Sequence, residues 1–221
     1  MTKELKSIST ETKEYYETLK IDVLWLHGRW KIYRQLFMKS EQRISLLNEC
    51  AGGVFNIMKF AQLDDFTLTL CRLTDPLKSA GKETLSLRRL IESLRKDSNE
   101  NIIIDLEKHF KELQEKCIPF RDHRNQRVAH KDLSISRKID PEPLPGISVK
   151  KIEDALSKLR HFMECFEYYF IESSPAYNNV DIGFDEETLI NVLKQSITFK
   201  DLSKKDIKLK QAFLNNRYKD A

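Results

Sequence analysis

The sequence is poor in the two residues that most often interrupt regular structure. Six Gly and six Pro among 221 residues disfavour a β-sandwich, because that fold needs many tight turns. We also find no run in which apolar and polar residues alternate, as they do in a half-buried strand. These absences favour long helices as the main elements of the chain.

Long apolar runs, leader sequences and cysteine pairs are missing as well. No run approaches the roughly 20 apolar residues of a membrane-spanning helix, and the N-terminal stretch is polar and charged, unlike a signal peptide. The cysteines lie far apart, without a CxxC pair or a His/Cys cluster of zinc spacing. We therefore expect buried free thiols, no metal or other cofactor, no membrane association and a reducing, cytoplasmic compartment. The cysteines are Cys50, Cys71, Cys117 and Cys165.

Basic residues are concentrated in two places. The net charge of +4 and the pI of about 8.7 indicate an anionic partner only weakly. Residues 121–138, however, hold four Arg and two Lys against two Asp. The stretch from Lys194 onward is also rich in lysine, and we expect it to be a solvated end.

Apolar residues recur at spacings of three and four along most of the chain, which predicts amphipathic helices. The cleanest pattern is a seven-residue repeat over residues 149–170, and it predicts a helix of about six turns. The predicted architecture is an all-α, up-and-down bundle of four to five main helices. Helical patterns cover residues 3–37, 41–75, 84–96, 101–117 and 149–170.

Short signals mark where these helices begin, end or break. Ser40 has the position of an N-cap, and Pro76 and Pro119 each stop or restart a helix. An interruption near Gly28 is an alternative for the first helix, and a break at Gly52–Gly53 is an alternative for the second.

The pattern weakens toward the C-terminus. The segment DPEPLPGIS contains three of the six prolines and predicts an exposed loop before the last bundle helix. After Pro175 we expect only a short helix at DEETLINVLKQSI and a basic tail. The predicted domains are a bundle at residues 1–175 and a helical, basic extension at residues 176–221.

The stretch FRDHRNQRVAH, residues 120–130, combines three arginines and two histidines with few apolar residues. A helix that begins at Pro119 would place Phe120, Arg124 and Val128 on one stripe, so that Arg124 interrupts an apolar face. Burying a charge is costly unless it is paired. Arg124 therefore either pairs with an acid or binds an anion in a cleft. The acids considered are Asp64, Asp65, Asp75 and Asp122.

His130, at the end of this stretch, has two interpretations as well. It is either a helix-end histidine that hydrogen-bonds a backbone carbonyl or a general acid or base, because an imidazole titrates near neutral pH. The residues alone leave both interpretations of His130 open.

Charges also interrupt the apolar pattern of DDFTLTLCRLTDP. Asp65, Arg72 and Asp75 either hold a metal ion or form ion pairs that fix helix packing, with Arg121 or Arg124 as partners. No second carboxylate cluster has metal-ligand spacing, so we predict the ion pairs. An aromatic stripe is expected in the core or at a dimer face. Its members are Trp25, Trp30, Tyr33 and Phe37.

The segment RNQRVAH, from Arg124 to His130, resembles the R-(polar)-x4–6-H motif of the HEPN superfamily, with Asn125 as the polar residue. The segments WKIYRQLF, LLNECAGGVF, DDFTLTLCRLTDP and RVAHKD are similar to the AbiU-type, abortive-infection branch of that superfamily. The likeness extends from about Trp30 to about Phe170.

This resemblance implies an all-α, dimeric domain and, in active members, a metal-independent endoribonuclease. By carry-over, His130 would act as general acid or base at the ribose 2′-OH, and Arg124 would stabilise charge on the scissile phosphate. Asn125 would orient the phosphate or the histidine, and the products would carry a 2′,3′-cyclic phosphate. The substrate would be RNA, cut in phage defence or by a toxin that has an antitoxin or defence partner. The supporting, RNA-binding residues would be Arg121, His123, Arg127 and Lys131.

Three features depart from the family pattern. Arg124 and His130 lie roughly 120° apart around an ideal helix, so a bend or a partner chain must bring them together. Arg127, three residues from His130, is better placed beside it. Lys131 and Asp132 follow His130, whereas toxins silenced by a nucleotidyltransferase have His-x-Tyr. The alternative function is a non-catalytic helical module that binds nucleotide, RNA or a protein partner.

Overall fold

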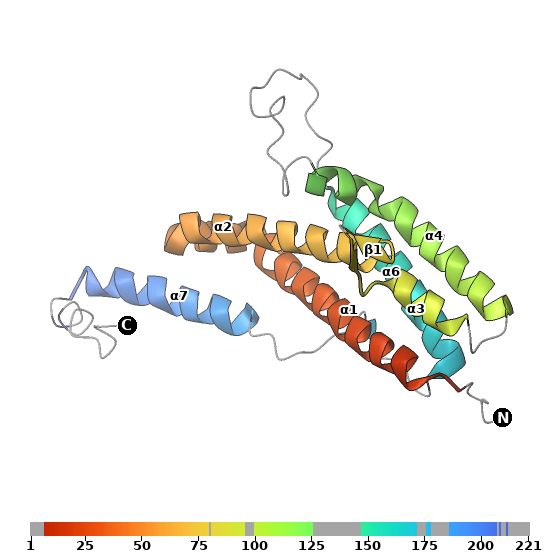
Figure 1. Cartoon of the computed structure of the whole chain (residues 1–221). Helices are drawn as coiled ribbons and strands as arrows, with labels where there is room; N and C mark the ends of the chain where they lie inside the picture. Colours follow the sequence, from red (N-terminus) through yellow and green to blue (C-terminus); the bar gives the residue numbers. More distant parts are fainter. Residues whose placement is uncertain are drawn as a thin grey trace, which may run out of the picture. The chain divides into compact units, whose positions relative to one another are not determined.

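The computed structural model describes residues 7–79, 81–95, 100–125, 147–171, 176–177, 186–206, 208 and 211. Over these residues the chain is almost entirely helical, which confirms the predicted all-α class (Figure 1). The elements are α1 (Thr10–Phe37), α2 (Glu41–Leu73), β1 (Lys78–Ser79), β2 (Lys82–Glu83), α3 (Leu87–Leu94), α4 (Glu100–His123), α6 (Val149–Phe170) and α7 (Glu186–Ser203).

The chain divides into two compact units, and each is described by itself. The first combines Met1–Trp30 with Gln62–Asp181, and the second combines Lys31–Ala61 with Ile182–Ala221. The predicted domain boundary at residue 175 stays a prediction.

In the first unit, α1 pairs with the last part of α2 in antiparallel fashion. Asp22 of α1 binds Arg72 of α2 at 2.9 Å, and Trp30 packs against Phe66. Residues later in α1 therefore contact residues earlier in α2. Helix α1 continues through Gly28, so the alternative of a break there is wrong.

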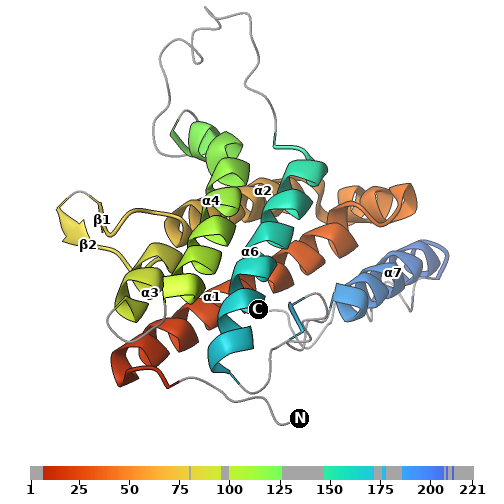
Figure 2. The same cartoon turned by 90° about the vertical axis from the view of Figure 1, so that its right-hand side faces the viewer.

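Helices α4 and α6 lie side by side and antiparallel, and α3 lies against α4 (Figure 2). Lys158 of α6 binds Glu112 of α4 at 2.6 Å, and the rings of Phe110 and Phe162 meet edge to face. Both helices bury an apolar stripe, as their three-and-four spacing predicts. The predicted helix at residues 149–170 is confirmed.

A buried polar cluster joins α1 to α6. Tyr16 stacks on Phe166 with ring centroids 4.8 Å apart, and its hydroxyl donates to Glu167 Oε1 at 2.9 Å. The Tyr177 hydroxyl donates to the same oxygen. Burial and the Glu167 carboxylate raise the pKa of both tyrosines, so both hydroxyls stay protonated and able to donate.

Two helix starts differ from the predictions. Helix α1 begins at Thr10, seven residues after the predicted start, because the Ser9 hydroxyl accepts a backbone N–H of its first turn at 3.2 Å. Helix α3 begins at Leu87 and not at Thr84. The backbone N–H of Thr84 donates instead to Leu77 at 3.0 Å and closes the β1–β2 hairpin.

The prediction that Pro119 starts a new helix is wrong. Helix α4 runs through Pro119 to His123 and continues as a π-type turn at Arg124–Asn125. A proline inside a helix removes one backbone hydrogen bond. Cys117 and Phe120 on either side of it are nevertheless fully buried, and this packing outweighs the local preference.

In the second unit, α2 begins after Ser40, whose hydroxyl accepts the backbone N–H of Arg43 at 3.2 Å, so the predicted cap is confirmed. The helix is kinked at Ala51 (φ −163°, ψ 59°), next to the predicted break at Gly52–Gly53. Glu187 of α7 receives two hydrogen bonds from the Arg43 guanidinium, each 2.9 Å long. These contacts tie α7 to the first turn of α2.

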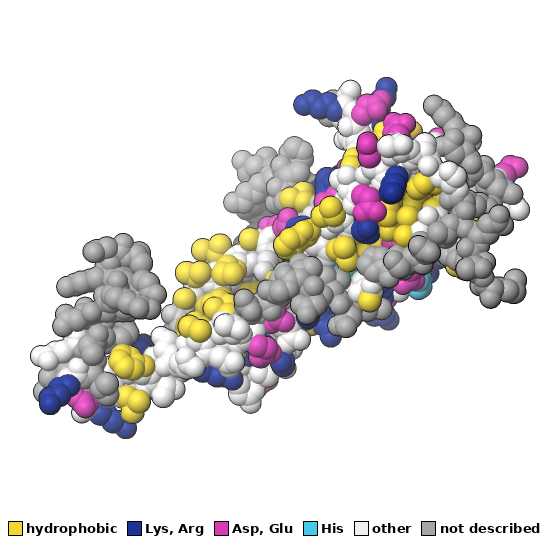
Figure 3. All heavy atoms as spheres, turned by 90° about the horizontal axis from the view of Figure 1, so that it is seen from below, with side chains coloured by type: hydrophobic (Ala, Val, Ile, Leu, Met, Phe, Trp, Pro, Cys, Tyr) yellow, Lys and Arg dark blue, Asp and Glu magenta, His cyan; other side chains and the backbone are white. Residues whose placement is uncertain are grey.

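The described surface carries exposed apolar side chains among the charged ones (Figure 3). Trp30, Tyr33 and Phe37 of the aromatic stripe are buried, whereas Trp25 is 48% exposed. Three of the four aromatic residues are therefore buried in the core. A dimer face at Trp25 stays a prediction. Among the described residues, no helix combines the length and the apolar character needed to cross a bilayer.

We predict that His27 makes the fold less stable in mild acid. It is 7% exposed, its Nδ1 hydrogen-bonds the Val23 carbonyl at 2.9 Å, and burial lowers its pKa from 6.5 to about 4. The unfolded chain gains a proton near pH 6.5 and the folded chain does not, so stability falls as the pH decreases through this window. The expected loss between about pH 7 and about pH 5 is about 2 kcal/mol.

Urea unfolding across this pH range measures the loss. The stability of the His27→Gln variant should depend less steeply on pH than that of the wild type. An unchanged slope in His27→Gln would contradict the prediction.

Candidate functional site

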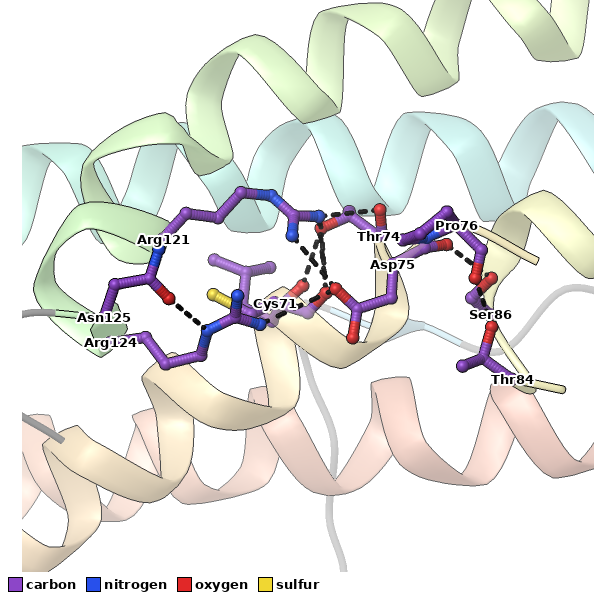
Figure 4. A network of polar contacts seen from close by, with 10 residues as sticks. Cys71, Thr74, Asp75, Pro76, Thr84, Ser86, Arg121, Arg124 and Asn125 are labelled. Carbon is purple, nitrogen blue, oxygen red and sulfur yellow. Dashed lines mark hydrogen bonds and ion pairs between the residues drawn. The ribbon is translucent and has the colours of Figure 1, made fainter. Parts of the chain in front are cut away.

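Two arginines from the end of α4 meet the residues that follow α2 (Figure 4). Arg121 lies in the last turn of α4, and Arg124 lies in the π-type turn after it. Helix α2 ends at Leu73, and Thr74 and Asp75 follow it directly. All of these residues belong to the first unit.

Arg121 is held by several acceptors at once. Its Nη1 donates to Asp75 Oδ1 at 2.9 Å, and its Nη2 donates to the carbonyl and the hydroxyl oxygen of Thr74, both at 2.7 Å. Thr74 is fully buried. Because a planar guanidinium has its donors in fixed directions, these bonds determine its orientation.

The end of α2 explains why an arginine is bound here. The last carbonyls of a helix have no partner within the helix, and Pro76 prevents the helix from continuing. Arg121 donates to the Cys71 carbonyl in the last turn of α2 at 3.5 Å and to the Thr74 carbonyl after it, and places a positive charge at the negative end of the helix dipole. The backbone carbonyl of Asp75 accepts a hydrogen bond from the Ser86 hydroxyl at 2.8 Å. Asp75 is thereby fixed through its side chain and its backbone.

Arg124 shares the carboxylate that Arg121 binds. Its Nη1 lies 3.6 Å from Asp75 Oδ1, and its Nε donates to Asn125 Oδ1 at 3.1 Å. The Arg124 side chain is 26% exposed and that of Asp75 is 18% exposed. Two guanidinium groups thus face one carboxylate oxygen, so among the residues that the structure describes this half-buried cluster holds one more positive than negative charge.

The interpretation of these charges as ion pairs is confirmed. Among the acids considered for Arg124, Asp75 is its partner, while Asp65 pairs with Arg29 and Arg72 pairs with Asp22. No group of three or more potential metal ligands was found within the described part of the chain.

The structure brings together some of the predicted site residues. Arg121, Arg124 and Asn125 lie in one network, and His123 is half-buried in the last turn of α4. Whether His130 meets Arg124 stays a prediction. The predicted site residues outside the described part of the chain are Arg127, His130 and Lys131.

Thr74 is the member of the network that the sequence-based reasoning missed. Its hydroxyl accepts from Arg121 and donates to helix carbonyls of α2, including that of Leu70 at 3.1 Å. The available signal was the Thr-Asp-Pro sequence, in which a hydroxyl residue stands at a helix end fixed by proline.

The cysteines next to the network are unsuited to nucleophilic chemistry. Burial raises the pKa of the Cys117 thiol to about 12 and also raises that of Cys71. A thiol is a poor nucleophile because the thiolate is the reactive form. All four cysteines are free, as predicted, although Cys50 and Cys165 are only half-buried.

The family comparison gives this helical bundle its class, which is that of a HEPN-like domain. The matching family model, HEPN_AbiU2 with the description AbiU2, covers residues 9–183, and the chain therefore belongs to the AbiU2 family. The comparisons with curated proteins and with solved structures found no significant match.

We predict that Asp75→Asn destabilises the first unit by about 1 to 3 kcal/mol, because two partly buried guanidinium groups lose their counter-charge. Urea unfolding of the variant and of the wild type measures the difference. The matched control is Asp154→Asn, which removes an exposed pair with Lys116 at 3.7 Å and should cost less than about 1 kcal/mol. Equal losses in the two variants would show that the network adds no more than a surface ion pair.

Proposed function

We propose that the chain is a metal-independent endoribonuclease of the HEPN type, which cleaves RNA in the cytoplasm in phage defence or as a toxin. The observation that supports this best is the shared carboxylate: Arg121 and Arg124 face one oxygen of Asp75 and leave a positive charge in excess. An RNA phosphate is the anion that would balance this charge. Asn125, the polar residue of the motif, adjoins the same guanidinium.

The proposed reaction uses the 2′-hydroxyl of the substrate as its nucleophile. His130 removes the 2′ proton, the 2′-oxygen attacks the adjacent phosphorus, and the bond from phosphorus to the 5′-oxygen breaks. The protonated His130 then gives this proton to the leaving 5′-oxygen. The products are a 2′,3′-cyclic phosphate and a 5′-hydroxyl, and DNA, which lacks the 2′-hydroxyl, is not cleaved.

The arginines have different proposed roles. Arg124, held loosely at 3.6 Å, is the cation that stabilises charge on the scissile phosphate. Arg121, with its donors committed to Asp75 and Thr74, positions the carboxylate against which Arg124 rests. Asn125 orients the phosphate or His130. The further RNA contacts are assigned to His123, Arg127 and Lys131.

We also propose a homodimer, because Arg124 and His130 would lie roughly 120° apart on an ideal helix. A two-fold partner would supply the second half of a composite site. Ile104 and Ile118, on the helix that carries Arg121, are 58% and 56% exposed, and burial of such side chains favours association. An antitoxin or another defence protein is the further expected partner.

A non-catalytic module that binds nucleotide, RNA or protein is the second candidate. The observation that favours it is that Arg124 already has a counter-ion in Asp75. A structural ion pair explains that contact without any reaction.

We predict that purified protein cleaves RNA in EDTA and that His130→Ala lowers the rate at least about 100-fold, the usual contribution of general acid or base catalysis. Arg124→Ala should lower it by about 100- to 1000-fold. Denaturing gels of a labelled RNA measure the rates. The control is Lys13→Ala, which removes an exposed lysine near the start of α1 and should leave the rate unchanged.

Two outcomes would count against the enzyme, and a third would reassign one of its residues. Folded wild type that cuts no RNA, or His130→Ala that cuts equally well, would favour the binding module. Cleavage lost in Arg127→Ala but retained in Arg124→Ala would assign the phosphate contact to Arg127. Light scattering of the same samples shows whether the active form is a dimer.

A further inference from the structure

A cavity of about 640 Å³ opens beside the shared carboxylate. Asp75, which binds both arginines, also lines this cavity. Leu77 and Phe110 contribute apolar wall, and polar groups come from three elements. The polar lining residues are Lys78 of β1, Arg88 of α3 and Gln114 of α4.

The walls combine the groups that recognise a nucleotide. The Arg88 guanidinium lies over the ring of Phe110 at 5.8 Å, and it is fixed by ion pairs with Glu107 and Glu92. A fixed planar guanidinium is a surface on which a base stacks. Gln114 is exposed and offers an amide donor and acceptor to a base edge. Lys78 is an exposed ammonium on the hairpin, suited to a phosphate.

The hairpin wall of the cavity is held in place by α3. Arg89 donates to the Leu77 carbonyl at 3.0 Å and binds Glu83 of β2 at 2.8 Å. The Thr84 N–H donates to the same Leu77 carbonyl at 3.0 Å, and the Thr84 hydroxyl donates to the Pro76 carbonyl. The backbone beside Lys78 is therefore fixed before any ligand binds, which lowers the entropy cost of binding.

We propose that this cavity binds the nucleotide that neighbours the scissile phosphate of the RNA, with the base against Arg88 and Gln114 and a phosphate at Lys78. This rests on the proposed ribonuclease function for the neighbouring phosphate at Arg124. The volume lies within the range of small-ligand sites, about 300 to 1,000 Å³. Asp75 does not repel the substrate, because the two arginines more than balance its charge.

The chain offers a matched pair of lysines for the test. Lys78 pairs with Glu83 and Ser79 with Lys82 in the hairpin register, and successive residues of a strand project to opposite faces. Lys82 therefore carries the same charge on the same short hairpin but projects to the opposite face. Lys78→Ala removes the proposed phosphate contact, and Lys82→Ala removes an equal charge outside it.

The experiment measures binding and cleavage separately. Binding of uridine and adenosine 5′-monophosphates, with inorganic phosphate as the comparison, is titrated by NMR on His130→Ala protein. We expect Lys78→Ala to weaken nucleotide binding about tenfold, the effect of losing one charge-assisted hydrogen bond, and Lys82→Ala to have no such effect. Leu77→Trp, which fills the cavity, should abolish binding. In proteins that keep His130, Lys78→Ala and Leu77→Trp should raise the KM for RNA and leave kcat nearly unchanged.

Each result bears on one proposal. Equal weakening by Lys78→Ala and Lys82→Ala, or phosphate binding as tight as nucleotide binding, would overturn the nucleotide cavity. Unchanged nucleotide binding in Lys78→Ala overturns it as well, even if Leu77→Trp fails to fold. Absence of His130-dependent cleavage refutes the ribonuclease, and nucleotide binding that depends on Lys78 then still supports the cavity.

Discussion

The first unit is organised around one carboxylate oxygen that faces two guanidinium groups. Asp75 Oδ1 contacts Arg121 and Arg124, and the same residue is tied through its backbone carbonyl to Ser86 at the start of α3. The ends of α2 and α4 and the beginning of α3 therefore converge on one residue. Two guanidinium groups share this one oxygen, whereas Asp22–Arg72 and Lys158–Glu112 are one-to-one pairs.

Much of the fold could be predicted because it depends on periodic burial. The apolar stripe at residues 149–170 predicts α6, and the proline after α2 predicts where α2 ends. The errors arose where tertiary contacts override local preference. Pro119 lies inside α4 because the residues around it are packed on both sides. The hairpin was missed because strands of two residues have no period to detect.

The residue types of the candidate site could be predicted from the sequence. Which of these residues contact one another could be predicted less well. An arginine that interrupts an apolar stripe needs a counter-charge, and this argument identified Asp75 among four acids without selecting it. The selection depends on where α2 ends relative to α4, which involves residues 46 to 50 positions apart in the sequence. Thr74 escaped notice for the same reason. His130 lies outside the described residues, so its place in the site is still inferred from the motif.

Hydrogen bonds hold the two ends of the β1–β2 hairpin. Pro76 and Leu77 are bound at one end and Thr84 at the other, while Gly81, with φ of +79°, has open space around it. A side chain at Gly81 would meet open space, but its backbone would be strained at this positive φ. A change at Gly81 would therefore act through backbone strain and not through side-chain packing.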